Sequence, residues 1–222
     1  VEEAMKSRVL VITGGPGTGK TTLVRAIITA AEQHDLKVHL MAPTGRAAKR
    51  LAIASHMDAD TIHKALEAEK REDGGTVFSR DESDPLEEDL IIVDEASMMD
   101  ISLFYHLLSA LKEEARLILV GDVDQLPPVG PGTPLKSIIA WGKVPVTKLK
   151  HIFRQKEGSG IIENAALIRE GNMCIPDEGG EFKILPVWSE EEAFDTVISL
   201  CRSLHYGEGK EKMALQVLSP MY

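Results

Sequence analysis

Short apolar runs bounded by turn residues alternate along this chain with stretches of helical periodicity. The strand-like runs cover residues 8–13, 37–41, 90–93 and 117–120. The stretches with apolar residues at helical spacing cover residues 20–34, 44–54 and 101–111. Because buried strands alternating with helices are typical of βαβ units, the pattern predicts an α/β fold, with a mostly parallel sheet carrying helices on both faces.

Residues 72–89 interrupt this alternation. They contain Gly74 and Gly75, a short segment at 76–80, and a region around Pro85 in which six of the nine residues from 81 to 89 are acidic. Turn residues of this kind predict an inserted hairpin or loop rather than a layer of the sheet.

The alternation starts again after Arg154. Residues 161–169 and 190–203 have helical spacing, and residues 182–187 and 215–218 are strand-like. We therefore expect one domain over residues 1–150, and a linker with the start of a second α/β domain over residues 151–222. The first residue is Val1 rather than Met, which suggests a fragment or a processed chain.

Composition and charge exclude few functions. The 222 residues are 43% apolar and 27% charged, and no apolar run reaches the roughly 18 residues that a membrane span needs. The chain start lacks a secretory signal and its two cysteines lie outside any metal-binding spacing, so reduced thiols and a cytoplasmic location are expected. The net charge of −10 argues mildly against a broad nucleic-acid surface, although Arg46, Lys49 and Arg50 leave room for a local basic stripe.

A phosphate loop is the strongest single motif. Gly14, Gly19, Lys20 and Thr21 satisfy the pattern GxxxxGK[ST], between a predicted buried strand and a predicted helix. Glycines let backbone N–H groups wrap phosphate oxygens, and the helix N-terminus adds a favourable dipole. Lys20 can reach the β- and γ-phosphates of ATP, and the Thr21 hydroxyl can ligate Mg²⁺. The residues expected to bind the nucleotide are Gly15, Pro16, Gly17, Thr18, Gly19, Lys20, Thr21 and Thr22.

Other strand ends supply the remaining groups that ATP hydrolysis needs. Asp94 and Glu95 follow the run at 90–93, and Gln125 lies in the loop after the run at 117–120. Because the carboxyl ends of parallel strands gather at one edge, we expect these side chains beside the phosphate loop. Asp94 is a candidate to hold Mg²⁺, Glu95 to activate water, and Gln125 to sense the γ-phosphate. Taken alone, an Asp-Glu pair is more often a solvated helix start.

Beyond these motifs, the sequence resembles superfamily 1 helicases, specifically the RecD type. The similar segments follow one another in the order ITGGPGTGKTT (12–22), MAPTGRAAKRL (41–51), TIHKAL (61–66), IIVDEASMMD (91–100), GDVDQLPPVGPG (121–132) and LKHIFRQ (149–155). They resemble helicase motifs I and Ia, the TIH segment, and motifs II, III and IV. The DEASM and GDxxQLPPVG wording is much more specific than a phosphate loop alone.

The resemblance implies a RecA-like motor domain of a 5′→3′ DNA helicase, a class that acts in DNA repair and recombination. It implies catalytic roles for Lys20, Glu95, Gln125 and Arg154, with Arg154 pointing at the γ-phosphate, and Mg²⁺ binding by Thr21 and Asp94. Single-stranded DNA would be contacted by Pro43, Thr44, Gly45, Arg46, Thr61 and His63. Residues 72–89 fall where this family carries a reduced domain 1B hairpin. Because RecD is also a subunit of exodeoxyribonuclease V, RecB- and RecC-like nuclease subunits are candidate partners.

Other functions remain open from the sequence. The chain could be a phosphate-loop NTPase that acts on a small molecule or remodels proteins, in which case DNA would not stimulate turnover. It could also be a nucleotide- or DNA-binding module that is inactive as a fragment, because motifs V and VI of the family would follow Tyr222.

Overall fold

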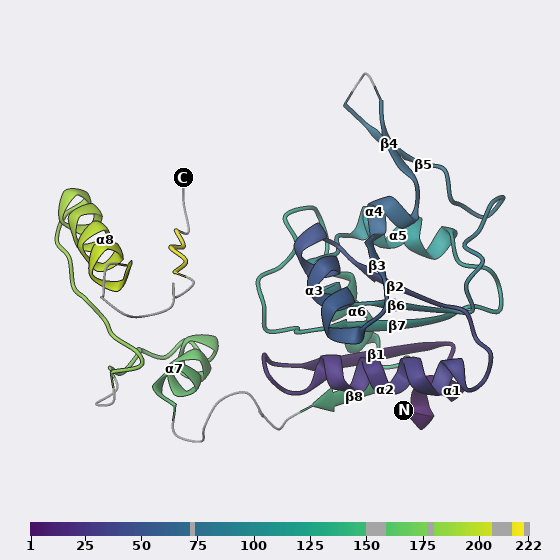
Figure 1. Ribbon diagram of the computed structural model, residues 1–222, viewed down its shortest axis with the longest axis horizontal. Coiled ribbons are helices and arrows are strands. Elements are labelled where there is room, and N and C mark those ends of the chain that lie inside the picture. Colours follow the sequence, from purple (N-terminus) through teal and green to yellow (C-terminus); the bar gives the residue numbers. More distant parts are fainter. Residues whose placement is uncertain (72–73, 150–158, 177–179, 206–214, 220–222) are drawn as a thin grey trace. The chain divides into compact units, whose positions relative to one another are not determined.

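A computed structural model describes residues 1–71, 74–149, 159–176, 180–205 and 215–219 of the chain (Figure 1). The chain divides into two compact units, Val1–Glu157 and Gly158–Tyr222. Within the described ranges, no helix is both long enough and apolar enough to cross a membrane.

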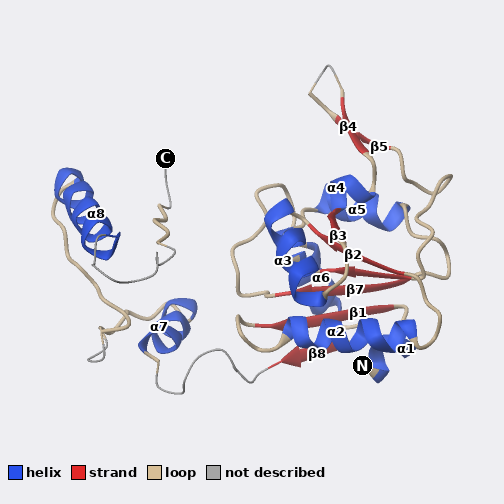
Figure 2. Ribbon diagram, in the orientation of Figure 1, coloured by secondary structure: helices blue, strands red, loops and turns tan. Residues whose placement is uncertain are grey.

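The first unit is built on a six-stranded sheet whose neighbouring strands all run parallel (Figure 1, Figure 2). The strands, in the order in which they lie across the sheet, are β3 (Ala59–Thr61), β2 (Val38–Ala42), β6 (Leu90–Val93), β7 (Arg116–Gly121), β1 (Val9–Gly14) and β8 (Val146–Leu149). Since parallel neighbours require crossover connections, the helices between them follow from the topology. The predicted parallel α/β sheet is confirmed.

Helices cover both faces of this sheet. They are α1 (Glu2–Lys6), α2 (Lys20–Glu32), α3 (Gly45–Ser55), α4 (Ile62–Ala65), α5 (Ile101–Ser109) and α6 (Pro134–Trp141), with a 3-10 turn η1 (Ala96–Met98). The predicted helices α2, α3 and α5 and the predicted strands β1, β2, β6 and β7 are present within a few residues of their expected bounds. Sequence periodicity missed β3, β8 and α6, because the two strands are short and half-exposed and so carry no continuous apolar run.

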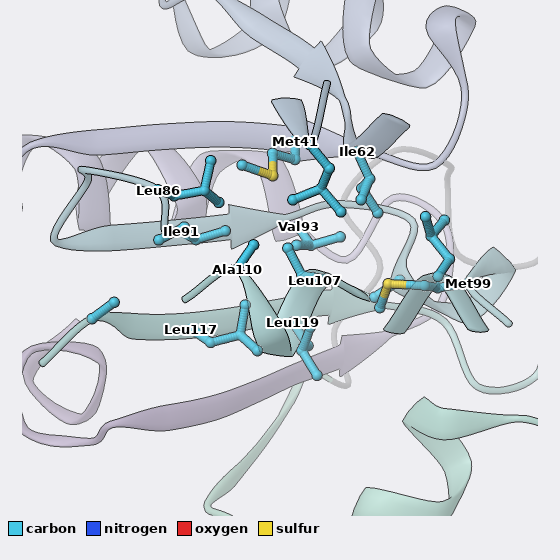
Figure 3. Close-up of a cluster of buried hydrophobic side chains, with 14 of the residues drawn as sticks. Met41, Ile62, Leu86, Ile91, Val93, Met99, Leu107, Ala110, Leu117 and Leu119 are labelled. Carbon is cyan, nitrogen blue, oxygen red and sulfur yellow. The ribbon is translucent and has the colours of Figure 1, made fainter. Parts of the chain in front are cut away.

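Successive residues of the central strands enter opposite cores, as expected for a sheet covered on both faces. On one face, Ile91 and Val93 of β6 pack with Leu107 of α5 (Figure 3). On the other face, Leu90 and Ile92 pack in a cluster with residues of α1, α2 and α3. The two cores hold the carboxyl ends of the strands at fixed positions, and the candidate functional residues follow those ends.

A separate two-stranded antiparallel hairpin joins β4 (Ala68–Lys70) to β5 (Thr76–Phe78). The sequence predicted a hairpin or loop starting at residue 72, whereas the paired strands start four residues earlier, at Ala68. The acidic stretch at 81–89 therefore follows the hairpin instead of forming it, and no strand lies within it. The acidic residues thus lie in the loop that leads from the hairpin to β6.

The described part of the second unit contains α7 (Gly160–Arg169) and α8 (Glu190–His205). Both helices were predicted. The predicted strands at 182–187 and 215–218 are wrong, because neither segment forms a strand in the structure. An apolar run becomes a strand only where a neighbouring strand pairs with its backbone N–H and C=O groups. Side chains such as Ile184 and Leu185 are accordingly exposed within this unit.

Candidate active site

The sheet of the first unit brings four chain segments to one edge. Because β1, β2, β6 and β7 are parallel, their carboxyl ends lie along the same edge (Figure 1). The phosphate loop follows β1, and Pro43 and Thr44 follow β2. Asp94 and Glu95 follow β6, and Asp122 follows β7. The sequence predicted this convergence for the segments after β1, β6 and β7.

The phosphate loop turns sharply between β1 and α2. Gly17 and Gly19 have φ angles of 75° and 86°, which a residue with a Cβ adopts only under strain. Thr18 is buried and its hydroxyl donates to the Gly15 carbonyl at 2.8 Å, which fixes the turn. Gly19 offers no side-chain cap to α2, so the first N–H groups of this helix are left for an anion.

Lys20 is the first residue of α2 and folds back over the loop. Its ammonium donates to the carbonyl oxygens of Gly14 at 2.6 Å and Gly15 at 2.9 Å. These bonds hold a positive charge directly beside the N-terminus of the helix. The arrangement is suited to a multiply charged phosphate chain.

Asp94 and Glu95 lie on the same edge as the phosphate loop. The Asp94 backbone N–H donates to the Met41 carbonyl at 2.9 Å, which ties the end of β6 to β2. Burial raises the pKa of Asp94, and the charge of Glu95 raises it further, although the charges of Lys20 and Arg50 oppose this. A carboxylate that is poorly solvated and close to another carboxylate favours a cation nearby.

A cavity of about 460 Å³ lies between the phosphate loop and these carboxylates. It gathers residues that are far apart in the sequence. Its lining consists of Pro16, Gly17, Gly19, Lys20, Thr21, Thr22, Arg50, Asp94, Glu95 and Gln125. All of these except Arg50 were assigned to the nucleotide site from sequence. Arg154, also assigned there, lies outside the described residues.

Arg50 is the functional candidate that sequence reasoning placed elsewhere. It was grouped with Arg46 and Lys49 as a source of positive charge, whereas its Nη2 donates to Glu95 Oε1 at 2.9 Å. The two residues are 45 positions apart, so no local spacing links them. Glu95 itself has a φ of 53°, which is rare for a residue with a side chain, and its other oxygen, Oε2, is buried with no hydrogen-bond partner among the described residues.

A larger cavity of about 880 Å³ adjoins this edge. Of the predicted DNA-contacting residues, Pro43, Thr44 and His63 line it, while Gly45, Arg46 and Thr61 do not. The other lining residues are Thr76, Phe78, Met98, Asp100, Ser102, Leu103, His106, Gln125, Leu126, Pro127, Pro128, Val129 and Gly130. Gln125 lines both cavities and is the lining residue that they share.

The threonines near this cavity are helix caps. The Thr44 hydroxyl accepts from the Ala47 N–H at 3.3 Å at the start of α3, and the Thr61 hydroxyl accepts from the Lys64 N–H at 3.1 Å at the start of α4. A capping hydroxyl uses its oxygen as acceptor and can still donate its own hydrogen. Thr44 is therefore able to donate to a phosphate while it caps α3.

Aromatic rings form part of the larger cavity. The centroids of His63 and Phe78 are 5.7 Å apart, and those of Phe78 and His106 are 4.4 Å apart. Phe78 comes from the hairpin and His106 from α5, and the sequence pointed to neither. Flat faces of this kind suit stacking with nucleic-acid bases.

Comparison with known proteins agrees with this geometry. Residues 1–131 match the protein family described as an AAA domain. The chain is 39% identical over 214 residues to the ATP-dependent RecD2 DNA helicase of Deinococcus radiodurans, covering 96% of this chain and 28% of that protein. It is 35% identical over 206 residues to the RecBCD enzyme subunit RecD of Mycolicibacterium smegmatis, covering 80% of this chain and 36% of that protein.

The solved structure of Pif1 helicase from Candida albicans has a similar fold. The TM-score is 0.58 at 24% identity, over 94% of this chain and 53% of that one. The RecD resemblance seen in the motifs is confirmed by the two relatives, and the RecA-like fold by this structure. The chain spans only 28% and 36% of the two relatives, so their activities belong to longer proteins.

Proposed function

We propose that this chain, which belongs to the AAA domain family, is the ATP-hydrolysing motor segment of a DNA helicase. The observation that carries the proposal is the shared position of Gln125, which lines both the cavity beside the phosphate loop and the cavity with aromatic walls. One amide side chain can hydrogen-bond a phosphate oxygen on one side and respond to a ligand on the other. The relative named above as an ATP-dependent DNA helicase supports the same function.

The nucleotide would bind in the smaller cavity. Its phosphates would meet the N-terminus of α2 and the ammonium of Lys20, which already lies among the loop carbonyls. The Thr21 hydroxyl and the Asp94 carboxylate supply oxygen ligands of the kind that Mg²⁺ prefers. Because Asp94 is poorly solvated, a cation beside it would stabilise the charged carboxylate. Bound Mg²⁺ would neutralise charge on the β- and γ-phosphates.

Glu95 is the proposed general base. As the water oxygen forms its bond to the γ-phosphorus, the bond to the ADP oxygen breaks, and the Glu95 carboxylate accepts the proton that the water loses. Gln125 is placed to contact the γ-phosphate, and Lys20 to balance charge on the transferring group. From the sequence resemblance we propose that Arg154 points at the γ-phosphate from the inter-domain side.

Single-stranded DNA would occupy the larger cavity. The Thr44 hydroxyl can donate to a phosphate, and the rings of His63 and Phe78 offer stacking faces for bases. Pro43, Gly45, Arg46 and Thr61 remain proposed contacts on the segments that border this cavity. We also propose 5′→3′ movement, a domain 1A at residues 1–150 with the hairpin as domain 1B, and a cytoplasmic location. The RecD relative is a RecBCD subunit, which makes nuclease subunits candidate partners.

The test is ATP turnover by the full-length protein, with Mg²⁺, in the presence and absence of an oligothymidylate. We expect DNA to increase ATP turnover. We expect Lys20→Ala to lower turnover by about a hundredfold or more, as the loss of other groups that stabilise transition-state charge does. Lys6→Ala is the control, because it removes an exposed charge from α1, outside the linings of both cavities. Unchanged turnover in Lys20→Ala would refute the site.

The same measurement separates the other candidate functions. Turnover that ignores DNA would indicate a phosphate-loop NTPase with another target. Turnover by residues 1–222 alone at the full-length rate would exclude a binding module that is inactive as a fragment.

A further inference from the structure

Helix α3 reaches both cavities of the first unit. Its N-cap, Thr44, lines the larger cavity, and Arg50, six residues later, lines the smaller one. At about 1.5 Å of rise per residue, the two positions are separated by roughly 9 Å of rigid helix. A ligand that displaces the start of α3 therefore also displaces the Arg50 side chain.

Arg50 acts on the proposed general base. Its guanidinium donates to Glu95 Oε1 at 2.9 Å, and Glu95 Oε2 is buried without a hydrogen-bond partner among the described residues. The Glu95 carboxylate is thus turned towards α3. While this contact is made, Oε1 is occupied by Arg50 and the carboxylate is not placed to accept a proton from the attacking water.

The pair is also easy to break. The Arg50 side chain is 68% exposed, whereas the Glu95 side chain is 17% exposed. When an ion pair is open to solvent on one side, the paired state is favoured over the separated state by only about fivefold. A modest shift of α3 is therefore enough to release Glu95.

We propose that Arg50 is a positioning residue that restrains Glu95 until single-stranded DNA occupies the larger cavity. DNA contact at Thr44 moves α3, Arg50 leaves Glu95, and the carboxylate turns to the attacking water. This inference rests on the proposed function, since it gives that site its regulation by DNA. It predicts that hydrolysis without DNA is slow because of the ion pair, and not because the phosphate loop is incomplete.

The experiment measures kcat and KM for ATP in the full-length protein, with and without saturating oligothymidylate. In Arg50→Ala we expect kcat without DNA to rise about fivefold, and the ratio of stimulated to unstimulated kcat to fall by the same factor. Arg50→Lys keeps the charge with a shorter reach and should give an intermediate ratio. Arg25→Ala, an exposed arginine of α2 outside both cavity linings, is the matched control and should keep the wild-type ratio.

Two results would overturn the inference. A fall in kcat in Arg50→Ala both with and without DNA would mean that Arg50 assists the phosphate chemistry directly. An unchanged ratio in a DNA-stimulated protein would mean that the ion pair has no part in the coupling, while leaving the helicase function intact. Absence of stimulation in the wild-type protein would instead refute the proposed function, and the coupling with it. Circular dichroism and binding of a fluorescent ATP analogue establish that the variants are folded.

Discussion

Replacement of Gly14 by alanine tests how closely the phosphate loop is packed against the sheet. Gly14 is the last residue of β1, and a Cβ at this position would lie 2.7 Å from Thr18 Oγ1 and 2.8 Å from the Leu149 carbonyl oxygen. Real Cβ atoms essentially never lie this close to another heavy atom, so either the loop or strand β8 must move. Gly15 provides the control, because a Cβ there would meet nothing within 4 Å.

The expected magnitude follows from these contacts. Overpacking of this kind costs about 1–3 kcal/mol, and the obstacle at Leu149 is backbone, which cannot rotate away. We therefore expect Gly14→Ala to lower the free energy of unfolding by about 2 kcal/mol, and Gly15→Ala to stay within roughly 0.5 kcal/mol of wild type. Displacement of Thr18 also breaks its bond to Gly15, so ATP should bind Gly14→Ala more weakly, by about tenfold.

Urea unfolding followed by circular dichroism measures the first effect. With a slope of about 2 kcal/mol per molar urea, the midpoint of Gly14→Ala should fall by about 1 M relative to Gly15→Ala. Titration with a fluorescent ATP analogue measures the second effect. Equal midpoints for the two variants would show that the close contacts at Gly14 are absorbed without cost, and the packing argument would then fail.

Two further outcomes follow from the contacts of single side chains. The Lys112 ammonium lies 2.6 Å from Asp89 and, together with the Lys37 N–H, lowers the pKa of the Asp89 carboxyl. The ionised carboxylate therefore stabilises the folded state fully above pH 3.8, the ordinary value, and this stabilisation is lost as the pH falls through the lower pKa of the folded state. Asp89→Asn should therefore cost about 1 kcal/mol of unfolding free energy at pH 7, allowing for solvent screening, and a difference that persists unchanged at pH 2 would contradict this. Phe78→Ala should weaken binding of a labelled oligothymidylate by about tenfold, as measured by fluorescence anisotropy. Tyr105→Ala removes an exposed ring outside the larger cavity and should leave binding unchanged, so equal losses in the two variants would argue against stacking on Phe78.

The predictions that succeeded depend on local information. A buried apolar run followed by glycines, a lysine and a helix predicts both the strand and the loop, since each step constrains the next within a few residues. Because parallel strands end on the same edge, the sequence also predicted that Asp94, Glu95 and Gln125 would share a cavity with Lys20, as they do. Their chemical roles remain proposals.

The predictions that failed, or were never made, depend on partners. The apolar run at 182–187 resembles β1 in its sequence pattern, but it forms no strand. Strand β1 forms because β7 and β8 pair with it on either side. The ring of Phe78 meets His63 and His106 only because the hairpin places it there.

The sequence by itself determined that this protein has a parallel α/β sheet with a phosphate loop and carboxylates along one edge. Hydrophobic periodicity and strand-end motifs are properties of neighbouring residues, and they persist in the fold. Only the tertiary structure decided that Arg50 of α3 meets Glu95 across 45 positions, and that Gln125 borders two cavities. Periodicity indicates which face of a helix is buried, but the side chain that an exposed arginine contacts depends on how helices and strand ends pack together.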